Sequence, residues 1–145
     1  MSEKILASGN NNIQEVVKAV IFKEGKFLLQ LRDNNPTIAY PNTWAFFGGG
    51  VDNGEKHDEA LKRELIEELG WYPKKFKYLT KYRNKTVNCN ITYYLMHYDL
   101  DKNKLCLGEG QAMNWFLSNE IMALNNKPDE IEIVVKMANQ YLKSI

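Results

Sequence analysis

The sequence is organised around residues 49–71, which read GGVDNGEKHDEALKRELIEELGW. Glycines open this segment, and an acidic run that contains regularly spaced leucines follows from His57 to Leu69. The leucines at positions 61, 65 and 69 are one helical turn apart, so the run predicts a helix with one apolar stripe. Gly70 stands where a helix C-cap commonly has glycine and needs no functional explanation.

Three glutamates, Glu64, Glu67 and Glu68, are predicted to lie beside the apolar stripe, because residues three and four apart share a helix face. Carboxylates clustered at a buried edge repel one another and lose hydration, which is costly unless a cation neutralises them. Mg²⁺ or Mn²⁺ suits such a cluster, because hard cations take oxygen ligands. The alternative is a solvated face with ion pairs to Lys62 and Arg63. The preceding glycines favour the metal site, because they let backbone groups approach the carboxylates.

The remaining composition is typical of one soluble globular domain. The 145 residues are 44% hydrophobic and 26% charged, and we expect a flexible lead-in over residues 1–12 and a single domain over 13–145. A net charge of +1 gives no electrostatic reason to bind nucleic acid or a membrane. Cys89 and Cys106 are too few for a disulfide framework, so both are expected to be buried in a cytoplasmic protein.

Short strand patterns and helical patterns together predict a mixed α/β fold with helices packed on a sheet. Strands are predicted at 15–22, 27–31, 44–47, 76–83, 87–100, 105–107 and 113–116, and helices at 57–69, 118–124 and 129–144. Ser118 is expected to cap the second of these helices. Residues 33–43 form a loop, and the glycines at 48–50 lie in a turn that does not match the dinucleotide-binding pattern.

The segment 49–71 resembles the Nudix box, in which a glycine, a glutamate and an Arg-Glu-apolar-any-Glu-Glu-any-Gly-apolar run follow one another at fixed spacing. The matching positions here are Gly49, Glu55, Arg63, Glu64, Leu65, Glu67, Glu68, Gly70 and Trp71. Trp71 replaces the usual aliphatic residue and Phe47 the usual upstream proline, but neither position is a ligand. The resemblance implies a Nudix fold, an α/β/α sandwich with a central mixed sheet. It also implies hydrolysis of a nucleoside diphosphate linked to a moiety X.

The resemblance implies a metal site for Mg²⁺, with Mn²⁺ as a substitute. Its ligands would be Glu64, Glu67 and Glu68, together with the backbone carbonyl of Gly48 and with Glu109, which precedes a Trp-Phe strand as in the MutT-like branch. Glu64 is our preferred general base, although members of the family differ on this point.

Two further residues of the motif are assigned supporting roles by the resemblance. Arg63 is expected to orient a glutamate, with Glu67 one turn away, and Glu55 to stabilise the loop. Gly49 and Gly70 are expected to be structural.

Three residues outside the motif are candidates for substrate binding. Arg32 stands where MutT-like enzymes have a phosphate-binding arginine. Phe46 stands where a side chain could line the base pocket. Asp129 stands where these enzymes have an Asn or Asp that hydrogen-bonds to the edge of a purine base. The alternatives are an exposed arginine, a core phenylalanine and a helix-terminal aspartate favoured by the dipole.

The leading substrate is a nucleoside triphosphate, canonical or oxidised, cleaved to the monophosphate and pyrophosphate. A nucleotide sugar or another NDP-X compound is the second candidate, and an RNA 5′ end the third, disfavoured by the near-neutral charge. A non-catalytic Nudix-fold ligand sensor is the alternative from another class, although such modules usually lose carboxylates that this chain retains. We expect a small-molecule nucleotide as partner, no membrane or nucleic-acid partner, and leave homodimer formation open.

Overall fold

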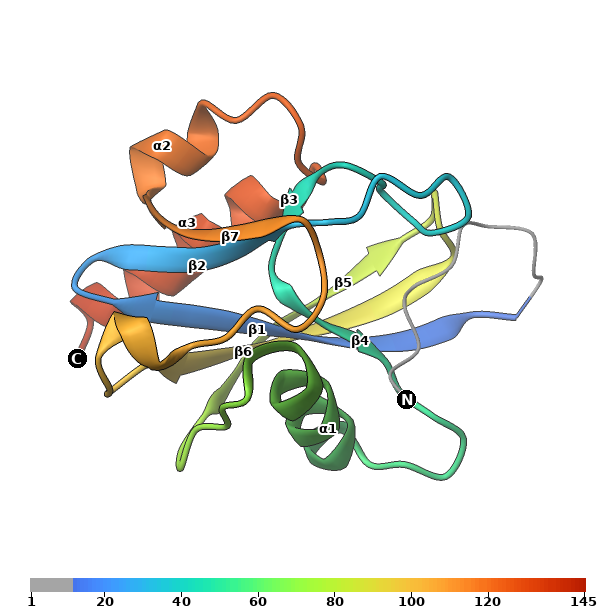
Figure 1. Cartoon of the computed structure of the whole chain (residues 1–145), viewed down its shortest axis with the longest axis horizontal. Helices are drawn as coiled ribbons and strands as arrows, with labels where there is room; N and C mark the ends of the chain where they lie inside the picture. Colours follow the sequence, from blue (N-terminus) through green and yellow to red (C-terminus); the bar gives the residue numbers. More distant parts are fainter. Residues whose placement is uncertain (1–11) are drawn as a thin grey trace.

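The computed structural model describes residues 12–145 and shows one mixed sheet with helices on both sides (Figure 1). The elements in chain order are β1 (Gln14–Lys23), β2 (Lys26–Leu31), β3 (Trp44–Ala45), β4 (Phe47–Gly50), α1 (His57–Leu69), β5 (Lys77–Asn84), β6 (Cys89–His97), the 3₁₀ turn η1 (Lys102–Lys104), β7 (Ala112–Leu117), α2 (Ser118–Met122) and α3 (Ile131–Lys143). Residues 1–11 of the expected lead-in lie outside the described part.

Strand β1 is the centre of the sheet, whose order is β3-β2-β1-β6-β5. It pairs in parallel with β6 and antiparallel with β2 near its end, so the sheet is mixed. On the edge that carries β2, the first half of β1 pairs with β4, from Val16 opposite Gly50 to Ala19 opposite Phe47. This pairing places the glycine-rich segment in the middle of the domain, beside α1.

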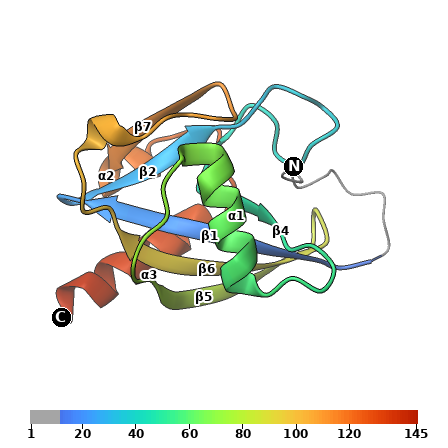
Figure 2. The same cartoon turned by 60° about the horizontal axis from the view of Figure 1, so that its bottom comes forward.

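Alternate residues of β1 enter two separate cores, because successive side chains of a strand point to opposite faces. Val17, Ala19 and Ile21 pack with the leucine stripe of α1, whereas Val16 and Val20 pack with the apolar face of α3. Figures 1 and 2 show α1 and α3 on opposite sides of the sheet. The expected α/β/α sandwich is confirmed.

At several positions the structure differs from the local predictions, because pairing with distant segments of the chain determines the local structure there. The glycines 48–50 belong to strand β4, not to a turn, since their backbone pairs with β1. The strand predicted at 87–100 spans only 89–97. Ser118 is the first residue of α2, whose N-cap is Leu117, and its hydroxyl accepts a hydrogen bond from the Asn139 amide at 2.8 Å.

Residues 105–107 do not form the predicted strand, because their backbone bonds to the end of α1. The amide of Cys106 donates to the Leu69 carbonyl at 3.3 Å, and that of Gly108 donates to the Glu68 carbonyl at 2.7 Å. Cys106 is consequently exposed, contrary to expectation, whereas Cys89 is buried, and both are free thiols. Among residues 12–145, no helix combines the length and apolar character needed to cross a membrane.

Candidate active site

Helix α1 buries two of its glutamates against the sheet and leaves the third partly exposed. Glu64 and Glu68 are one turn apart and only 1% and 3% exposed, whereas Glu67 lies about 100° around the helix from Glu68. The three carboxylates differ in burial, and their shared role as metal ligands stays a prediction. In the described range 12–145, no three acidic, histidine or cysteine side chains converge on one preformed metal site.

The Glu68 carboxylate is held at the junction of α1, β4 and β2. Its Oε1 accepts a hydrogen bond from the Gly48 amide at 3.1 Å, and its Oε2 accepts one from Gln30 Nε2 at 3.2 Å. Burial raises the pKa of Glu68 well above its usual range, the Lys18 charge opposes this shift, and Glu64 and Glu109 add to it. A divalent cation would relieve the cost of this buried charge, and the all-oxygen donor set suits Mg²⁺ or Mn²⁺.

The two glycines before this junction are needed for different reasons. Gly48 has φ +147°, and a Cβ there would lie 2.0 Å from the Val17 carbonyl oxygen. At Gly49 a Cβ would lie 2.5 Å from Glu64 Oε1. Gly48 therefore permits the strand pairing, and Gly49 makes room for the Glu64 carboxylate.

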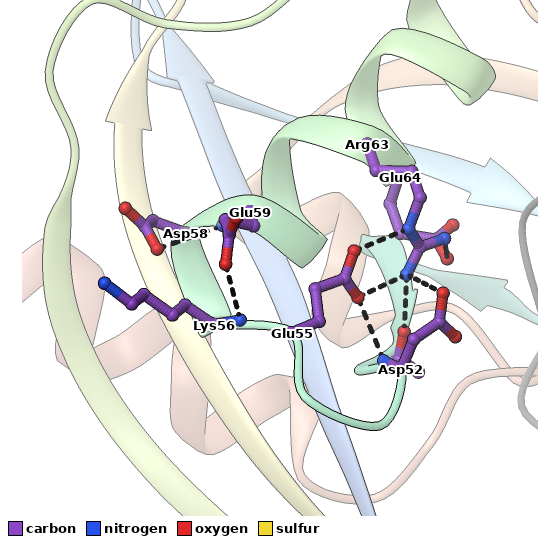
Figure 3. A network of polar contacts seen from close by, with 8 residues as sticks. Asp52, Glu55, Lys56, Asp58, Glu59, Arg63 and Glu64 are labelled. Carbon is purple, nitrogen blue, oxygen red and sulfur yellow. Dashed lines mark hydrogen bonds and ion pairs between the residues drawn. The ribbon is translucent and has the colours of Figure 1, made fainter.

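Arg63 ties the loop before α1 to Glu64 (Figure 3). Its Nε and Nη2 donate to the two oxygens of Glu55 at 2.9 and 2.8 Å, and its Nη1 donates to Glu64 Oε1 at 2.9 Å. Glu55 Oε1 also accepts a hydrogen bond from the Asp52 amide at 2.9 Å. Arg63 thus orients its neighbour Glu64 and not Glu67, and Glu55 connects the loop to it.

The same contacts predict a dependence of stability on pH. Hydrogen bonds from Arg63 lower the pKa of Glu55 to about 2 from an ordinary value of 4.5. A depressed folded-state pKa stabilises the fold above about pH 4.5, and this contribution is lost as the pH falls toward 2. We expect the free energy of unfolding to fall more steeply with acidification in the wild type than in Glu55→Gln. The difference in slope should approach one proton, about 1.4 kcal/mol per pH unit.

Urea titrations at pH values between 5 and 2.5 measure these slopes. Glu24→Gln, in the exposed turn between β1 and β2, is the matched control and should follow the wild type. Parallel curves for wild type and Glu55→Gln would show that the pair with Arg63 contributes nothing.

A pocket lies on the sheet face that carries α3. Its lining is mainly apolar and contains the polar residues Lys18, Arg32, Tyr40, Tyr93 and Glu130. Phe46 also lines it, packed edge-to-face on Tyr93 with ring centroids 6.1 Å apart. Phe46 is thus both a core residue, 2% exposed, and a wall of this pocket.

The pocket contains Glu130 and not the expected Asp129. Asp129 is exposed and outside the lining, whereas Glu130 is 3% exposed and accepts a hydrogen bond from the Tyr93 hydroxyl at 3.4 Å. Helical spacing explains the difference, because residue 130 shares a face with the buried Val134 and Ala138. The same spacing in the sequence would have identified Glu130.

Two buried cations line the same pocket. Arg32 Nε donates to the Ala39 carbonyl at 3.0 Å, but its Nη2 is buried and has no hydrogen-bond partner in the part of the chain that the structure describes. Lys18 Nζ donates to the Phe46 carbonyl at 3.1 Å. Burial lowers the pKa of Lys18, as does nearby Arg32, against the opposing effect of Glu68. Arg32 is thus not an exposed arginine. Lys18 is not among the site residues predicted from the sequence, although a charged residue within the apolar strand run at 15–22 marks a candidate.

The loop at 105–110 carries Glu109 to the end of α1. A Cβ at Gly108 would lie 2.2 Å from the Glu67 carbonyl oxygen, so the loop packs directly on the helix. Glu109 is partly buried and close enough to Glu68 to raise the pKa of that carboxyl. Its assignment as a metal ligand stays a prediction.

A mixed sheet between helices, with a glycine strand facing buried carboxylates, defines the Nudix class of fold. The NUDIX domain family matches residues 13–137, and the chain belongs to this family of hydrolases. It is 31% identical over 120 residues to the CTP pyrophosphohydrolase of Escherichia coli, covering 83% of this chain and 87% of that protein.

Other similarities are shorter or structural. An RNA pyrophosphohydrolase of Baumannia cicadellinicola is 36% identical over 78 residues, which cover 52% of this chain and 45% of that protein. The crystal structure of a MutT NUDIX hydrolase from Burkholderia pseudomallei superposes with a TM-score of 0.76 at 21% identity, covering 88% of this chain and 98% of that one. The latter likeness supports the fold.

Proposed function

We propose that the chain hydrolyses a nucleoside triphosphate, canonical or oxidised, to the nucleoside monophosphate and pyrophosphate. The observation that carries this proposal is the buried pair Glu64 and Glu68 facing the glycine strand, with a pocket holding Lys18, Arg32 and Glu130 on the other face of the sheet. The similarity to a CTP pyrophosphohydrolase over 87% of its length supports it.

Mg²⁺, with Mn²⁺ as a substitute, is the proposed cofactor. Glu64, Glu67, Glu68 and Glu109, with the Gly48 carbonyl, would hold it, and it would neutralise the pyrophosphate and supply an activated water. The protein's own contribution is positioning.

Positioning is achieved by hydrogen bonds to the carboxylates. Arg63 holds the carboxylate of Glu64, our proposed general base, while the Gly48 amide and Gln30 hold that of Glu68. Arg32, whose buried Nη2 has no hydrogen-bond partner among the described residues, is the proposed phosphate-binding residue.

A substrate panel tests the proposal directly. The purified protein is incubated with the common and oxidised nucleoside triphosphates, nucleotide sugars and 5′-triphosphorylated RNA, each with Mg²⁺, Mn²⁺ or a chelator. We expect metal-dependent release of pyrophosphate from at least one nucleoside triphosphate. Turnover of a nucleotide sugar alone would replace the proposal with the second candidate. Binding without turnover would indicate a ligand sensor, and no turnover or binding would contradict all three.

Glu130 is expected to contribute to base recognition, whereas Asp129 is not. Glu130→Gln should lower kcat/KM for the preferred nucleotide by about 10–100-fold, because a hydrogen bond to a buried charged group is worth about 1.5–3 kcal/mol. Steady-state kinetics with the best substrate of the panel measure this. Asp129→Asn is the matched control and should stay within about twofold of wild type. Equal effects of the two changes would show that the pocket is not the base site.

The remaining sequence-based expectations stay predictions. They are a single domain over residues 13–145, a cytoplasmic location, no nucleic-acid partner, and an open question of homodimer formation.

A further inference from the structure

Lys18 lines the pocket of the proposed substrate site, but the proposed hydrolysis assigns no role to its buried ammonium group. It lies in the middle of β1, is 5% exposed, and is flanked on the same sheet face by the fully buried Val16 and Val20. Placing a charge there is costly unless its donors are used. An ammonium has three donors, and within residues 12–145 Lys18 uses one of them, to the Phe46 carbonyl.

A counter-ion role alone does not explain Lys18. Glu68, Glu64 and Glu130 are near enough to raise its pKa, yet no carboxylate of the described residues lies within the 4.0 Å of a salt bridge. Its two other donors therefore have no close acceptor among residues 12–145. Lys18 lines the pocket, so a bound molecule can supply one.

Lys18 and Glu130 are placed together by strand pairing. Lys18 is the register partner of Tyr93 on β6, so both side chains lie on one face of the sheet, and the Tyr93 hydroxyl donates to Glu130. Arg32 lines the same pocket, and its buried Nη2, which has no partner within residues 12–145, independently indicates a ligand rich in acceptors. The pocket thus presents a donor and an acceptor at defined positions.

We propose that Lys18 is a specificity-determining residue that donates a hydrogen bond to a ring nitrogen or carbonyl of the substrate's base, while Glu130 accepts one from the adjacent amino group. The proposal rests on the proposed function, since it assumes a nucleotide substrate. Cytosine presents an amino donor next to a ring-nitrogen acceptor, whereas uracil presents a carbonyl acceptor next to a ring N–H donor. Uracil would place donor against donor and acceptor against acceptor, which leaves buried groups unsatisfied.

The test compares binding of CMP, UMP and inorganic pyrophosphate to the wild type and to Lys18→Met by calorimetry. We expect the wild type to bind CMP at least about tenfold more tightly than UMP, because a site built for a hydrogen bond rejects the mismatched analogue. Lys18→Met should weaken CMP by about tenfold and bring the CMP-to-UMP ratio close to one. The affinity for pyrophosphate should stay within about twofold, because it has no base.

Lys23→Met, on the same strand but outside the pocket, is the matched control and should behave as wild type. If Lys18→Met does not fold, Lys18→Gln, which retains a neutral donor, should give a ratio between those of wild type and unity. An unchanged ratio, or an equal loss of CMP and pyrophosphate affinity, would overturn the proposal. Failure of the proposed function would give a different result: no nucleoside triphosphate would be hydrolysed, whatever the measured affinities for CMP and UMP.

Discussion

Glu68→Gln is expected to lower kcat by more than about 100-fold without unfolding the domain. The change removes a buried negative charge where the proposed cation would bind, and loss of even an outer-shell partner of a metal ligand costs about 10–100-fold. The fold should tolerate the change, because glutamine has the same shape and its oxygen can still accept from the Gly48 amide. Steady-state kinetics in Mg²⁺ and thermal unfolding with and without Mg²⁺ measure both effects.

The thermal data separate a metal ligand from a structural carboxylate. A cation that binds only the folded state raises its melting temperature, so Mg²⁺ should stabilise the wild type more than Glu68→Gln. Without Mg²⁺ the variant should be at least as stable as the wild type, because the change removes a carboxyl group whose ionisation burial makes costly. Glu67→Gln should also lose most turnover, and Glu24→Gln in the exposed turn is the control for both. Unchanged turnover in Glu68→Gln would contradict the proposed metal site.

Gly49→Ala should lower turnover while leaving the fold nearly intact, whereas Gly48→Ala should damage the fold itself. The new Cβ at position 49 would meet the end of the Glu64 side chain, which can move away. Moving it takes the proposed base out of place, so we expect a loss of kcat of about 10–100-fold. The free energy of unfolding should change by less than about 1.5 kcal/mol.

At position 48 the added Cβ would meet the backbone carbonyl of Val17, which cannot move without breaking the pairing of β4 with β1. The positive φ of Gly48 adds strain for any other residue, so we expect a loss of roughly 3 kcal/mol or more. Urea unfolding and kinetics measure the two variants side by side. Gly54→Ala, which also has a positive φ but open space around it, is the control for general strain before α1. Equal losses of stability at positions 48 and 49 would contradict this division of roles.

The box at 49–71 allowed the helix, its leucine stripe and its fold family to be predicted from local spacing. Helix α1 has the predicted bounds, His57–Leu69, because a helix is held by contacts within a few residues. Gly70 adopts the left-handed φ of +66° that the C-cap prediction requires. These features depend only on residues that are close together in the sequence, so the sequence alone is enough to predict them.

The sequence by itself therefore determined the acidic helix, the glycines that precede it and the family to which the chain belongs. Only the tertiary structure decided that Arg63 donates its hydrogen bond to Glu64 and not to Glu67. It also decided that Glu130, and not Asp129, lines the pocket. Only the tertiary structure brought Lys18 to the same pocket, 112 positions from Glu130 in the chain. The physical reason is that these contacts follow from strand register and sheet packing, which join distant segments and leave no short-range pattern in the sequence.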